Sequence, residues 1–171
     1  MNKFILNLCF AFALVCFTSC SSEDMQDESS PLVGVWKLTA WNVNGGFDMN
    51  NDGMVNTNLL NEIDCDRNET LFFDEKGVVS LNTTFNPDIN ISLLKDETNE
   101  YSFDVVCDTE GVISLATSYT FMDSTVMIGE SVAMIQGDQI FLVFEDRIKI
   151  YNEDFTEVLF TKDLTLVYTK Q

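Results

Sequence analysis

The sequence contains no histidine among its 171 residues, and this absence removes several kinds of catalytic site. A Ser-His-Asp triad or a Cys-His pair cannot be assembled, and no zinc or iron site can use an imidazole ligand. Catalysis would have to depend on carboxylates, lysine, tyrosine or a hard metal ion. The acidic residues are too numerous to single out one pair, and no specific catalytic motif is present. We therefore do not expect an enzyme.

Basic residues are scarce, with nine Lys and Arg against 28 Asp and Glu and a formal net charge of −19. Removal of an N-terminal segment containing Lys3 would leave eight basic residues against the same 28 acidic ones, a net charge of −20. Such a charge repels nucleic acid and anionic membrane surfaces. We expect no nucleic-acid partner, and contact with a membrane only through a covalent anchor.

Long apolar runs are absent except at the N-terminus, where the fourteen residues from Phe4 to Phe17 are interrupted only by Asn7. A spanning helix needs roughly 20 apolar residues, whereas a signal-peptide core needs about 7–15. Thr18-Ser19-Cys20 follow, and small residues before a cysteine resemble the lipobox of bacterial lipoproteins, although Phe17 stands where Leu is more usual. We expect a signal peptide at residues 1–19 and lipidation of Cys20. An ordinary signal cleaved elsewhere, leaving a free thiol, is the alternative.

Residues 20–31 are polar and acidic, a composition that cannot bury enough apolar surface to become ordered, so we expect a flexible tether. Serines followed by acidic residues after the lipidated cysteine resemble the surface-export signal of Bacteroidetes lipoproteins. That resemblance implies an outer-membrane lipoprotein that faces the cell exterior. A plain spacer, with the domain on the periplasmic face, is the alternative.

The remaining 140 or so residues suffice for one domain and contain successive strand patterns with no convincing helix. Turns with Gly77, Gly111 and Gly137 predict three hairpins, and 58–62 is the only segment with helical character. Even turn spacing favours an all-β antiparallel barrel or sandwich of eight to ten strands. The expected strands are 33–41, 69–74, 78–85, 101–107, 112–121, 124–135, 139–144, 147–151 and 164–168, with 158–160 as an optional short strand.

The run Leu32-Val33-Gly34-Val35-Trp36-Lys37-Leu38 resembles the Gly-x-Trp start of lipocalin-like domains. Residues 58–62, Cys65, the run 70–74 and Gly77 are similar to lipocalin-like lipoproteins of the Bacteroidetes. The resemblance is best over 32–79, and it implies that 32–171 form a small up-and-down barrel or half-barrel with a cavity. It also implies that Trp36 plugs the closed end of the barrel, which is a packing role.

The segment from Asp48 to Asn56 matches the first half of an EF-hand calcium loop, D-x-[DN]-x-[DN]-G. The bidentate acid expected at the twelfth position is replaced by Leu59, so Glu62 could complete the site only if the chain folds back. We predict a structural Ca²⁺ site with an affinity on the order of 10⁻⁴–10⁻³ M. The alternative is a solvated Asn/Asp/Gly turn. The candidate ligands are Asp48, Asn50, Asp52, the carbonyl of Met54, Asn56 and Glu62.

Two cysteines remain once Cys9 and Cys16 leave with the signal peptide and Cys20 carries the lipid. Cys65 and Cys107 form an even pair in an oxidising compartment, so we predict a disulfide worth roughly 4 kcal/mol. Two separate thiols are the alternative.

Glu130 and Arg147 lie in strand-like runs, and we consider them as weak ligand-binding candidates because a charge facing a barrel interior needs a partner. Placement on the outward face is the alternative. Two function classes follow. The first is a lipid-anchored binding module, expected to be a monomer, for a small apolar or amphipathic ligand or an envelope partner. The second is a structural or interaction protein of the envelope with a filled core and no ligand.

Overall fold

The computed structural model describes residues 30–83, 85–94, 100–107 and 113–171. The expected signal peptide, Cys20 and nearly all of the expected tether therefore lie outside the described residues. So does Gly111, which we expected in a hairpin turn.

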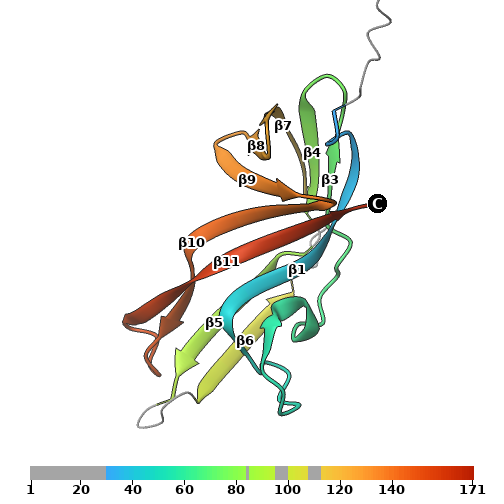
Figure 1. Cartoon of the computed structure of the whole chain (residues 1–171). Helices are drawn as coiled ribbons and strands as arrows, with labels where there is room; N and C mark the ends of the chain where they lie inside the picture. Colours follow the sequence, from blue (N-terminus) through green and yellow to red (C-terminus); the bar gives the residue numbers. More distant parts are fainter. Residues whose placement is uncertain (1–29, 84, 95–99, 108–112) are drawn as a thin grey trace, which may run out of the picture.

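The described chain is almost entirely β-structure (Figure 1). Its one helical element is a 3₁₀ turn, η1, within the segment expected to have helical character. The elements in chain order are β1 (Gly34–Phe47), β2 (Asn56–Asn58), η1 (Leu59–Asn61), β3 (Thr70–Phe73), β4 (Val78–Thr83), β5 (Pro87–Leu93), β6 (Tyr101–Cys107), β7 (Ile113–Met122), β8 (Thr125–Ile128), β9 (Ser131–Gln136), β10 (Gln139–Tyr151) and β11 (Val158–Lys170).

Eight strands close into an antiparallel barrel in the order β1-β3-β4-β7-β8-β9-β10-β11, with β11 pairing back onto β1. Because each of these strands pairs with the next barrel strand along the chain, the barrel has the up-and-down form that the lipocalin-like resemblance implies. Closure leaves these strands without a free edge over their paired lengths. The remaining strands, β2, β5 and β6, lie outside the ring.

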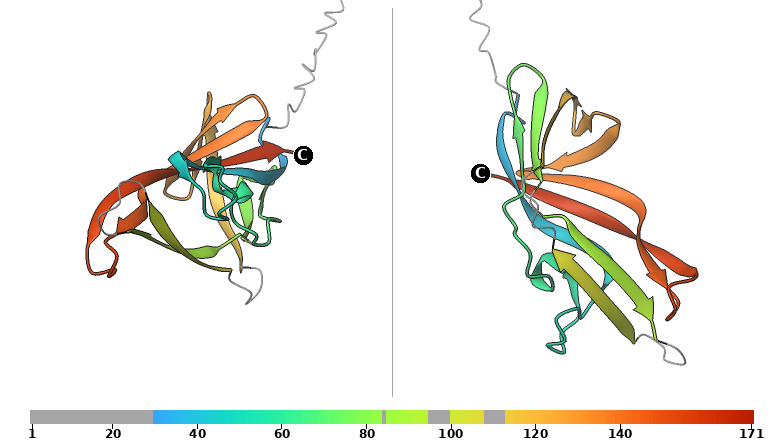
Figure 2. Two further views of the ribbon diagram at one scale, coloured as in Figure 1. Left: turned by 90° about the horizontal axis from the view of Figure 1, so that it is seen from below. Right: turned by 180° about the vertical axis from the view of Figure 1, so that it is seen from behind.

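The three longest strands run past the barrel and build a second, open part of the molecule (Figures 1 and 2). There β5 and β6 form a hairpin that attaches to the far end of β10 by a short parallel pairing, Ile150 with Ile91 and Tyr151 with Ser92. On the other side, β2 pairs with the far end of β1. The order β6-β5-β10-β11-β1-β2 is therefore a bent sheet that continues from one side of the barrel.

The inward-facing side chains of the barrel strands are large and buried, in keeping with the alternation read from the sequence. Trp36 is 1% exposed and Phe73 is fully buried, and their rings meet edge to face at 6.4 Å. The indole Nε1 of Trp36 donates a hydrogen bond to the carbonyl of Leu32 at 2.7 Å. Trp36 therefore has the packing role that the lipocalin-like resemblance implies.

The residues at and just before the start of β1 meet the C-terminal residues beside this core. The backbone N–H of Gln171 donates to the carbonyl of Val35 at 2.9 Å, and the ammonium of Lys170 donates to the carbonyl of Pro31. The first and last barrel strands are thus joined beyond their own ladder.

Two of the three expected hairpins are confirmed: β3 pairs with β4 around Gly77, and β9 pairs with β10 around Gly137. Both glycines have positive φ, at 81° and 59°, as the tight turns require. The expected pairing of 101–107 with 112–121 is wrong. The strand at 101–107, β6, pairs with β5, whereas β7 pairs with β4 and β8.

The expected single strand 124–135 is also wrong, because it is two strands, β8 and β9, separated by a turn at Gly129 with φ of 58°. Conversely, segments expected as separate strands are continuous in β10 and β11. A β-bulge between Phe144 and Ile148, with Asp146 at φ of 52°, lets β10 continue. Within the described ranges no helix is long and apolar enough to cross a membrane.

Candidate functional site

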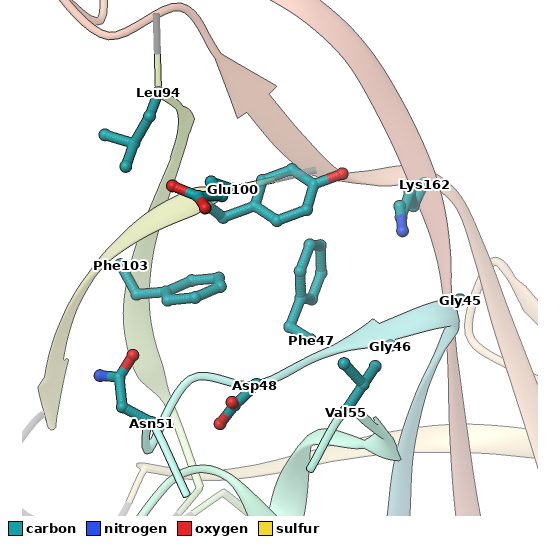
Figure 3. A pocket seen from close by; sticks show the side chains of 11 residues that line it. Gly45, Gly46, Phe47, Asp48, Asn51, Val55, Leu94, Glu100, Phe103 and Lys162 are labelled. Atoms are coloured by element: carbon teal, nitrogen blue, oxygen red, sulfur yellow. The ribbon is translucent and has the colours of Figure 1, made fainter. Parts of the chain in front are cut away.

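The candidate site is a pocket of about 570 Å³ in the open part of the molecule, outside the closed barrel (Figure 3). Its walls come from the far end of β1, the acidic loop after it, the facing ends of the β5–β6 hairpin, and β11. These segments are distant in sequence, and they meet because β1 and β11 both extend beyond the ring and the hairpin folds over them. A volume of this size suits a small-molecule ligand.

One wall is aromatic. Phe47, at the end of β1, is only 2% exposed, and its ring packs edge to face on Tyr101 at 5.2 Å and on Phe103 at 5.6 Å. Tyr101 and Phe103 belong to β6 and are half-buried, so part of each ring remains accessible. Phe47 therefore acts as a fixed support behind two partly open aromatic faces.

The pocket also contains a lysine. The ammonium of Lys162, on β11, lies 4.6 Å from the centroid of the Phe47 ring and donates a hydrogen bond to the carbonyl of Asn44 at 2.9 Å. Partial burial lowers the pKa of Lys162 below its usual value. Gly45, with φ of 78°, leaves room for this ammonium, since a Cβ there would lie 3.2 Å from it. Within the described residues the ammonium of Lys162 donates one hydrogen bond, to Asn44, which leaves two of its three N–H groups for a ligand.

Acidic and amide side chains complete the polar lining. Glu100, just before β6, and Asn51 in the acidic loop are exposed, and Asp48 is half-buried. Lys162 and Glu100 approach the pocket from different sides (Figure 3). The pocket therefore offers acceptors, donors and aromatic surface together.

The acidic loop, residues 48–56, is held by its own first residue. The carboxylate of Asp48 accepts hydrogen bonds from the backbone N–H groups of Asp52 and Gly53, both at 3.0 Å. The side chain of Asn50 accepts from the same Asp52 N–H at 3.0 Å, and Gly53 turns the chain with φ of 87°. The loop thus has the compact turn that the sequence motif predicts.

Glu62 reaches back into this loop, as a calcium site would require of it. Its side chain is 6% exposed, and one carboxylate oxygen accepts from the N–H groups of Met49 at 2.8 Å and Asn50 at 3.2 Å. The other oxygen accepts from the side-chain amide of Asn56. Leu59, at the twelfth motif position, is instead fully buried in the core.

The candidate calcium ligands are brought to one loop, but they do not form a ready metal centre. Asp52 and Met54 are exposed, and the Asp52 carboxylate accepts from the Met54 N–H at 2.8 Å. Asn56 donates to Glu62, and its amide also lies 3.5 Å from the Met54 carbonyl. In the described part of the chain, no three acidic or cysteine side chains are grouped closely enough to hold a metal ion.

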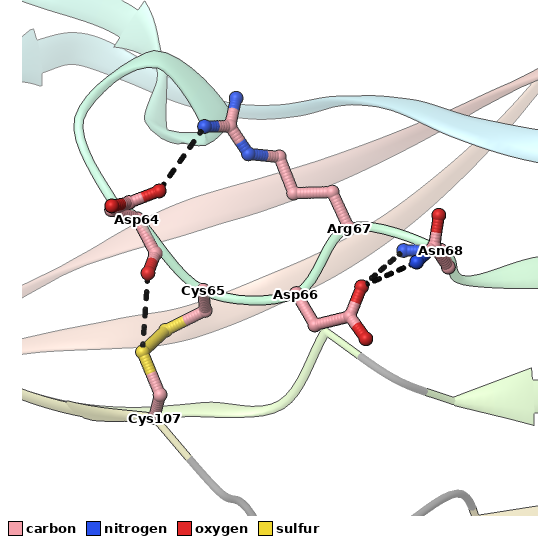
Figure 4. Close-up of polar contacts among 6 residues, drawn as sticks. All are labelled: Asp64, Cys65, Asp66, Arg67, Asn68 and Cys107. Carbon is pink, nitrogen blue, oxygen red and sulfur yellow. Dashed lines mark hydrogen bonds and ion pairs between the residues drawn. A yellow bond between two sulfur atoms is a disulfide. The ribbon is translucent and has the colours of Figure 1, made fainter.

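The predicted disulfide is confirmed: Cys65 and Cys107 are bonded, with their Cα atoms 5.5 Å apart (Figure 4). The bond joins the segment after η1 to the end of β6. Because β6 carries the aromatic wall and the segment before Cys65 carries Glu62, the disulfide links this wall to the segment whose Glu62 accepts hydrogen bonds from the acidic loop. The nearby ion pair of Arg67 with Asp64 at 3.9 Å is exposed and contributes little.

Neither weak ligand candidate faces an interior. Glu130 lies in the turn between β8 and β9 and is exposed, because Gly129 breaks the apolar run that we interpreted as one strand. Arg147 lies in β10 and is also exposed. It shares the outward side of the strand with Val143 and Lys149, opposite the buried Ile148. The outward alternative is correct for both residues.

One buried charge that the sequence did not single out lies near the start of β3. Glu69 is 7% exposed and accepts a hydrogen bond from the hydroxyl of Tyr168 on β11. Burial raises the pKa of Glu69, although the bonds from Tyr168 and from the backbone of Phe85 oppose the shift. Burial and the Glu69 charge also raise the pKa of Tyr168. This pair lies among packed side chains, so we assign it a structural role.

Sequence reasoning missed the pocket itself. Tyr101 and Phe103 were expected only as strand residues, whereas Phe47 and Lys162 lie outside the expected strands. Nothing in the spacing of these residues brings them together. One signal was available: Gly45-Gly46-Phe47 stands directly before the acidic loop, and paired glycines mark a close approach of backbones. Comparison of this chain with protein-family models, with curated proteins and with solved structures finds no match.

Proposed function

We propose that this chain is a lipid-anchored, surface-exposed binding module whose pocket takes a small amphipathic ligand. The observation that carries the proposal is the 570 Å³ pocket, which combines an aromatic wall with a lysine and two carboxylates. Binding sites for small molecules are typically concave, with apolar walls and a few well-placed polar groups.

The pocket, and not the barrel interior, is the better binding site. The lipocalin-like resemblance implies a cavity inside the barrel. The inward side chains there, including Trp36, Phe73 and Ile140, are almost wholly buried within one hydrophobic cluster. A ligand could enter that region only by displacing packed core side chains, which is costly. The pocket at the open end requires no such change.

The binding proposal is tested by native mass spectrometry of protein purified from its own membrane, followed by extraction of bound small molecules. We expect a bound compound in the unmodified protein and its loss in a Tyr101→Ala variant. Phe160→Ala is the matched control, because Phe160 is a partly exposed aromatic residue on β11 that does not line the pocket. Equal retention in both variants would argue against this site.

The anchoring proposal depends on Cys20 and on the apolar run 4–17. Metabolic labelling with a fatty acid should label the unmodified protein and not a Cys20→Ser variant. Protease treatment of intact cells should then degrade the domain if it faces the exterior. Protection until the outer membrane is opened would instead place it on the periplasmic face.

We also propose a structural Ca²⁺ at the acidic loop, with Asp48, Asn50, Asp52 and Glu62 as candidate side-chain ligands. The support is that Glu62 folds back to the loop and lies among its backbone N–H groups. An ion there would order a loop that lines the pocket, since Asp48 and Asn51 belong to both.

Calorimetric titration with Ca²⁺ should give a dissociation constant on the order of 10⁻⁴–10⁻³ M, and Asp48→Ala or Asp52→Ala should abolish the heat. Asp138→Ala is a matched control in an exposed turn away from the loop. If the unmodified protein gives no heat, the loop is held by its own hydrogen bonds alone.

A second candidate function, an envelope interaction protein, is favoured by one further observation. The outward face of β8 and β9 exposes several large apolar side chains, each about half or more accessible: Met127, Val132 and Met134, with Met122 and Val143 on the flanking strands. Cross-strand pairing makes Met127 and Val132 direct neighbours. Exposed apolar clusters of this kind mark interaction sites.

A photo-crosslinking residue at position 134, introduced into the protein in intact cells, tests this alternative. The interaction function requires one discrete adduct from position 134 and none from position 118, an exposed serine on β7. The absence of any adduct at position 134 would leave the binding module as the better reading.

A further inference from the structure

We infer that the ligand of this pocket is a neutral sugar, held with one ring face against Tyr101 and Phe103. This inference rests on the proposed binding function and narrows it to a class of ligand. It is drawn from three properties of the pocket: the shape of its aromatic wall, the mixture of its polar groups and the sign of its charges.

The aromatic wall fits a ring with an apolar face. The ring centroids of Tyr101 and Phe103 lie 6.2 Å apart, and the ring planes are tilted by 36° to each other. The two rings therefore form a shallow angled surface and not a closed slot. Phe47 is buried behind both rings and fixes their orientation. The C–H groups on one side of a pyranose ring pack well on such a surface, because they are apolar and need no hydrogen-bond partner.

The polar groups fit hydroxyls. A hydroxyl group both donates and accepts. The lining supplies acceptors in the carboxylates of Glu100 and Asp48 and donors in the ammonium of Lys162 and the amide of Asn51. A ligand with several hydroxyls at its edge can satisfy both kinds of group at once. A purely apolar ligand would cover these charged groups without replacing their hydrogen bonds to water, which is costly.

The charges disfavour ions of either sign. An anion would approach a chain with a net charge of −19 and meet Glu100 and Asp48 at the pocket. A cation would be attracted by the same carboxylates, but inside the pocket it would meet the like charge of the Lys162 ammonium, which lies over Phe47. A neutral ligand avoids both repulsions and uses both kinds of charged group as hydrogen-bond partners. The sugar expected here is therefore neither a uronic acid nor an amino sugar with a free amine.

The test is binding of the purified protein to an array of neutral di- and trisaccharides built from hexoses, pentoses, deoxyhexoses and N-acetylhexosamines. Glucuronate, glucosamine and laurate are included as anionic, cationic and apolar probes. We expect binding to at least one neutral sugar, weakened about tenfold or more by Phe103→Ala, since loss of one aromatic contact is worth about that factor. Phe160→Ala should leave binding unchanged.

Because Phe103→Ala removes packing as well as a sugar contact, Glu100→Gln is the second variant. Glu100 is exposed, so this change should leave the fold intact while weakening sugar binding. Binding of laurate with no neutral sugar bound would overturn the sugar assignment and leave the binding module standing. Tighter binding of glucuronate or glucosamine than of any neutral sugar would also overturn it. If no probe of any class binds, both the sugar and the binding module are wrong.

Discussion

The carboxylate of Glu62 accepts a hydrogen bond from the backbone N–H of Met49 at 2.8 Å, across the base of the acidic loop. The same oxygen accepts from Asn50, so a single buried side chain satisfies two N–H groups at the point where β1 ends. The loop that lines the pocket is therefore fixed from outside itself, by a residue that follows η1.

Replacing this carboxylate should loosen the loop. Glu62→Ala leaves the N–H groups of Met49 and Asn50 without their acceptor, so we expect the free energy of unfolding to fall by about 1–3 kcal/mol. Chemical denaturation measures this loss, and amide exchange should show it as faster exchange at both positions. Asp64→Ala, a change at a nearby exposed carboxylate, should have little effect. Unchanged exchange at Met49 would contradict the role given to Glu62.

The pair of Glu69 and Tyr168 should make stability depend on pH. Burial raises the pKa of Glu69, so the folded protein binds its proton more tightly than the unfolded chain does. The stabilisation from this group is fully present below the usual glutamate pKa and is lost as the pH rises through the raised value. Acidification from about pH 8 to about pH 5 should therefore raise the stability of the unmodified protein relative to that of Glu69→Gln.

Denaturant titrations at several pH values measure that difference. Glu69→Leu is the second variant. Leucine cannot accept the hydrogen bond from the Tyr168 hydroxyl, so this change should lower the free energy of unfolding by about 1–3 kcal/mol. A difference between the unmodified protein and Glu69→Gln that is constant with pH would show that Glu69 is ionised throughout.

Loss of the disulfide should destabilise the whole domain and the pocket with it. Cys65 and Cys107 are 42 positions apart, and a cross-link over such a loop restricts the unfolded chain by about 4 kcal/mol in the chain-entropy account. The double variant Cys65→Ala/Cys107→Ala should show this loss in thermal unfolding, without a stray thiol. Reduction of the unmodified protein should reproduce it. A Tm that is unaffected by either treatment would contradict the prediction.

Two glycines with almost the same backbone conformation should respond very differently to alanine. Gly46 and Gly137 have φ of 60° and 59°, so each change carries a similar backbone cost. A Cβ on Gly46 would overlap the backbone of Asn56 in the facing strand, whereas nothing lies within 4 Å of one on Gly137. Gly46→Ala should therefore be roughly 1–3 kcal/mol more destabilising than Gly137→Ala, as measured by thermal unfolding. Equal losses would mean that β2 does not lie against β1 in solution.

The barrel could be predicted from the sequence because local signals repeat around it. Apolar alternation and the glycines at 77 and 137 place the β3–β4 and β9–β10 hairpins, and the pairing of Cys65 with Cys107 follows from the parity of the cysteines. The β5 strand was missed because Pro87, Asn90 and Ser92 dilute its apolar pattern. A proline is tolerated there because it stands at the first residue of the strand.

The candidate site was only partly predictable, for a different physical reason. The acidic loop is a contiguous motif, so its compact turn could be read from adjacent residues. The pocket joins Phe47, Phe103 and Lys162, which lie far apart in the chain and meet only because long strands extend past the ring. No periodicity within one segment encodes such a meeting. The return of Glu62 to the loop likewise depends on η1, which redirects the chain.

The junction of Gln171 with Val35 has a mechanical consequence. Force applied between residue 31 and a ligand held at the far end of β1 would run along the length of that strand. The register pairs joining β1 to β11, from Trp36 with Lys170 to Val43 with Leu164, would then be loaded in shear and would share the tension. Pulling residues 31 and 171 apart would instead peel the same seam open one pair at a time. The molecule should thus resist traction on a ligand placed in the pocket far better than traction between residues 31 and 171.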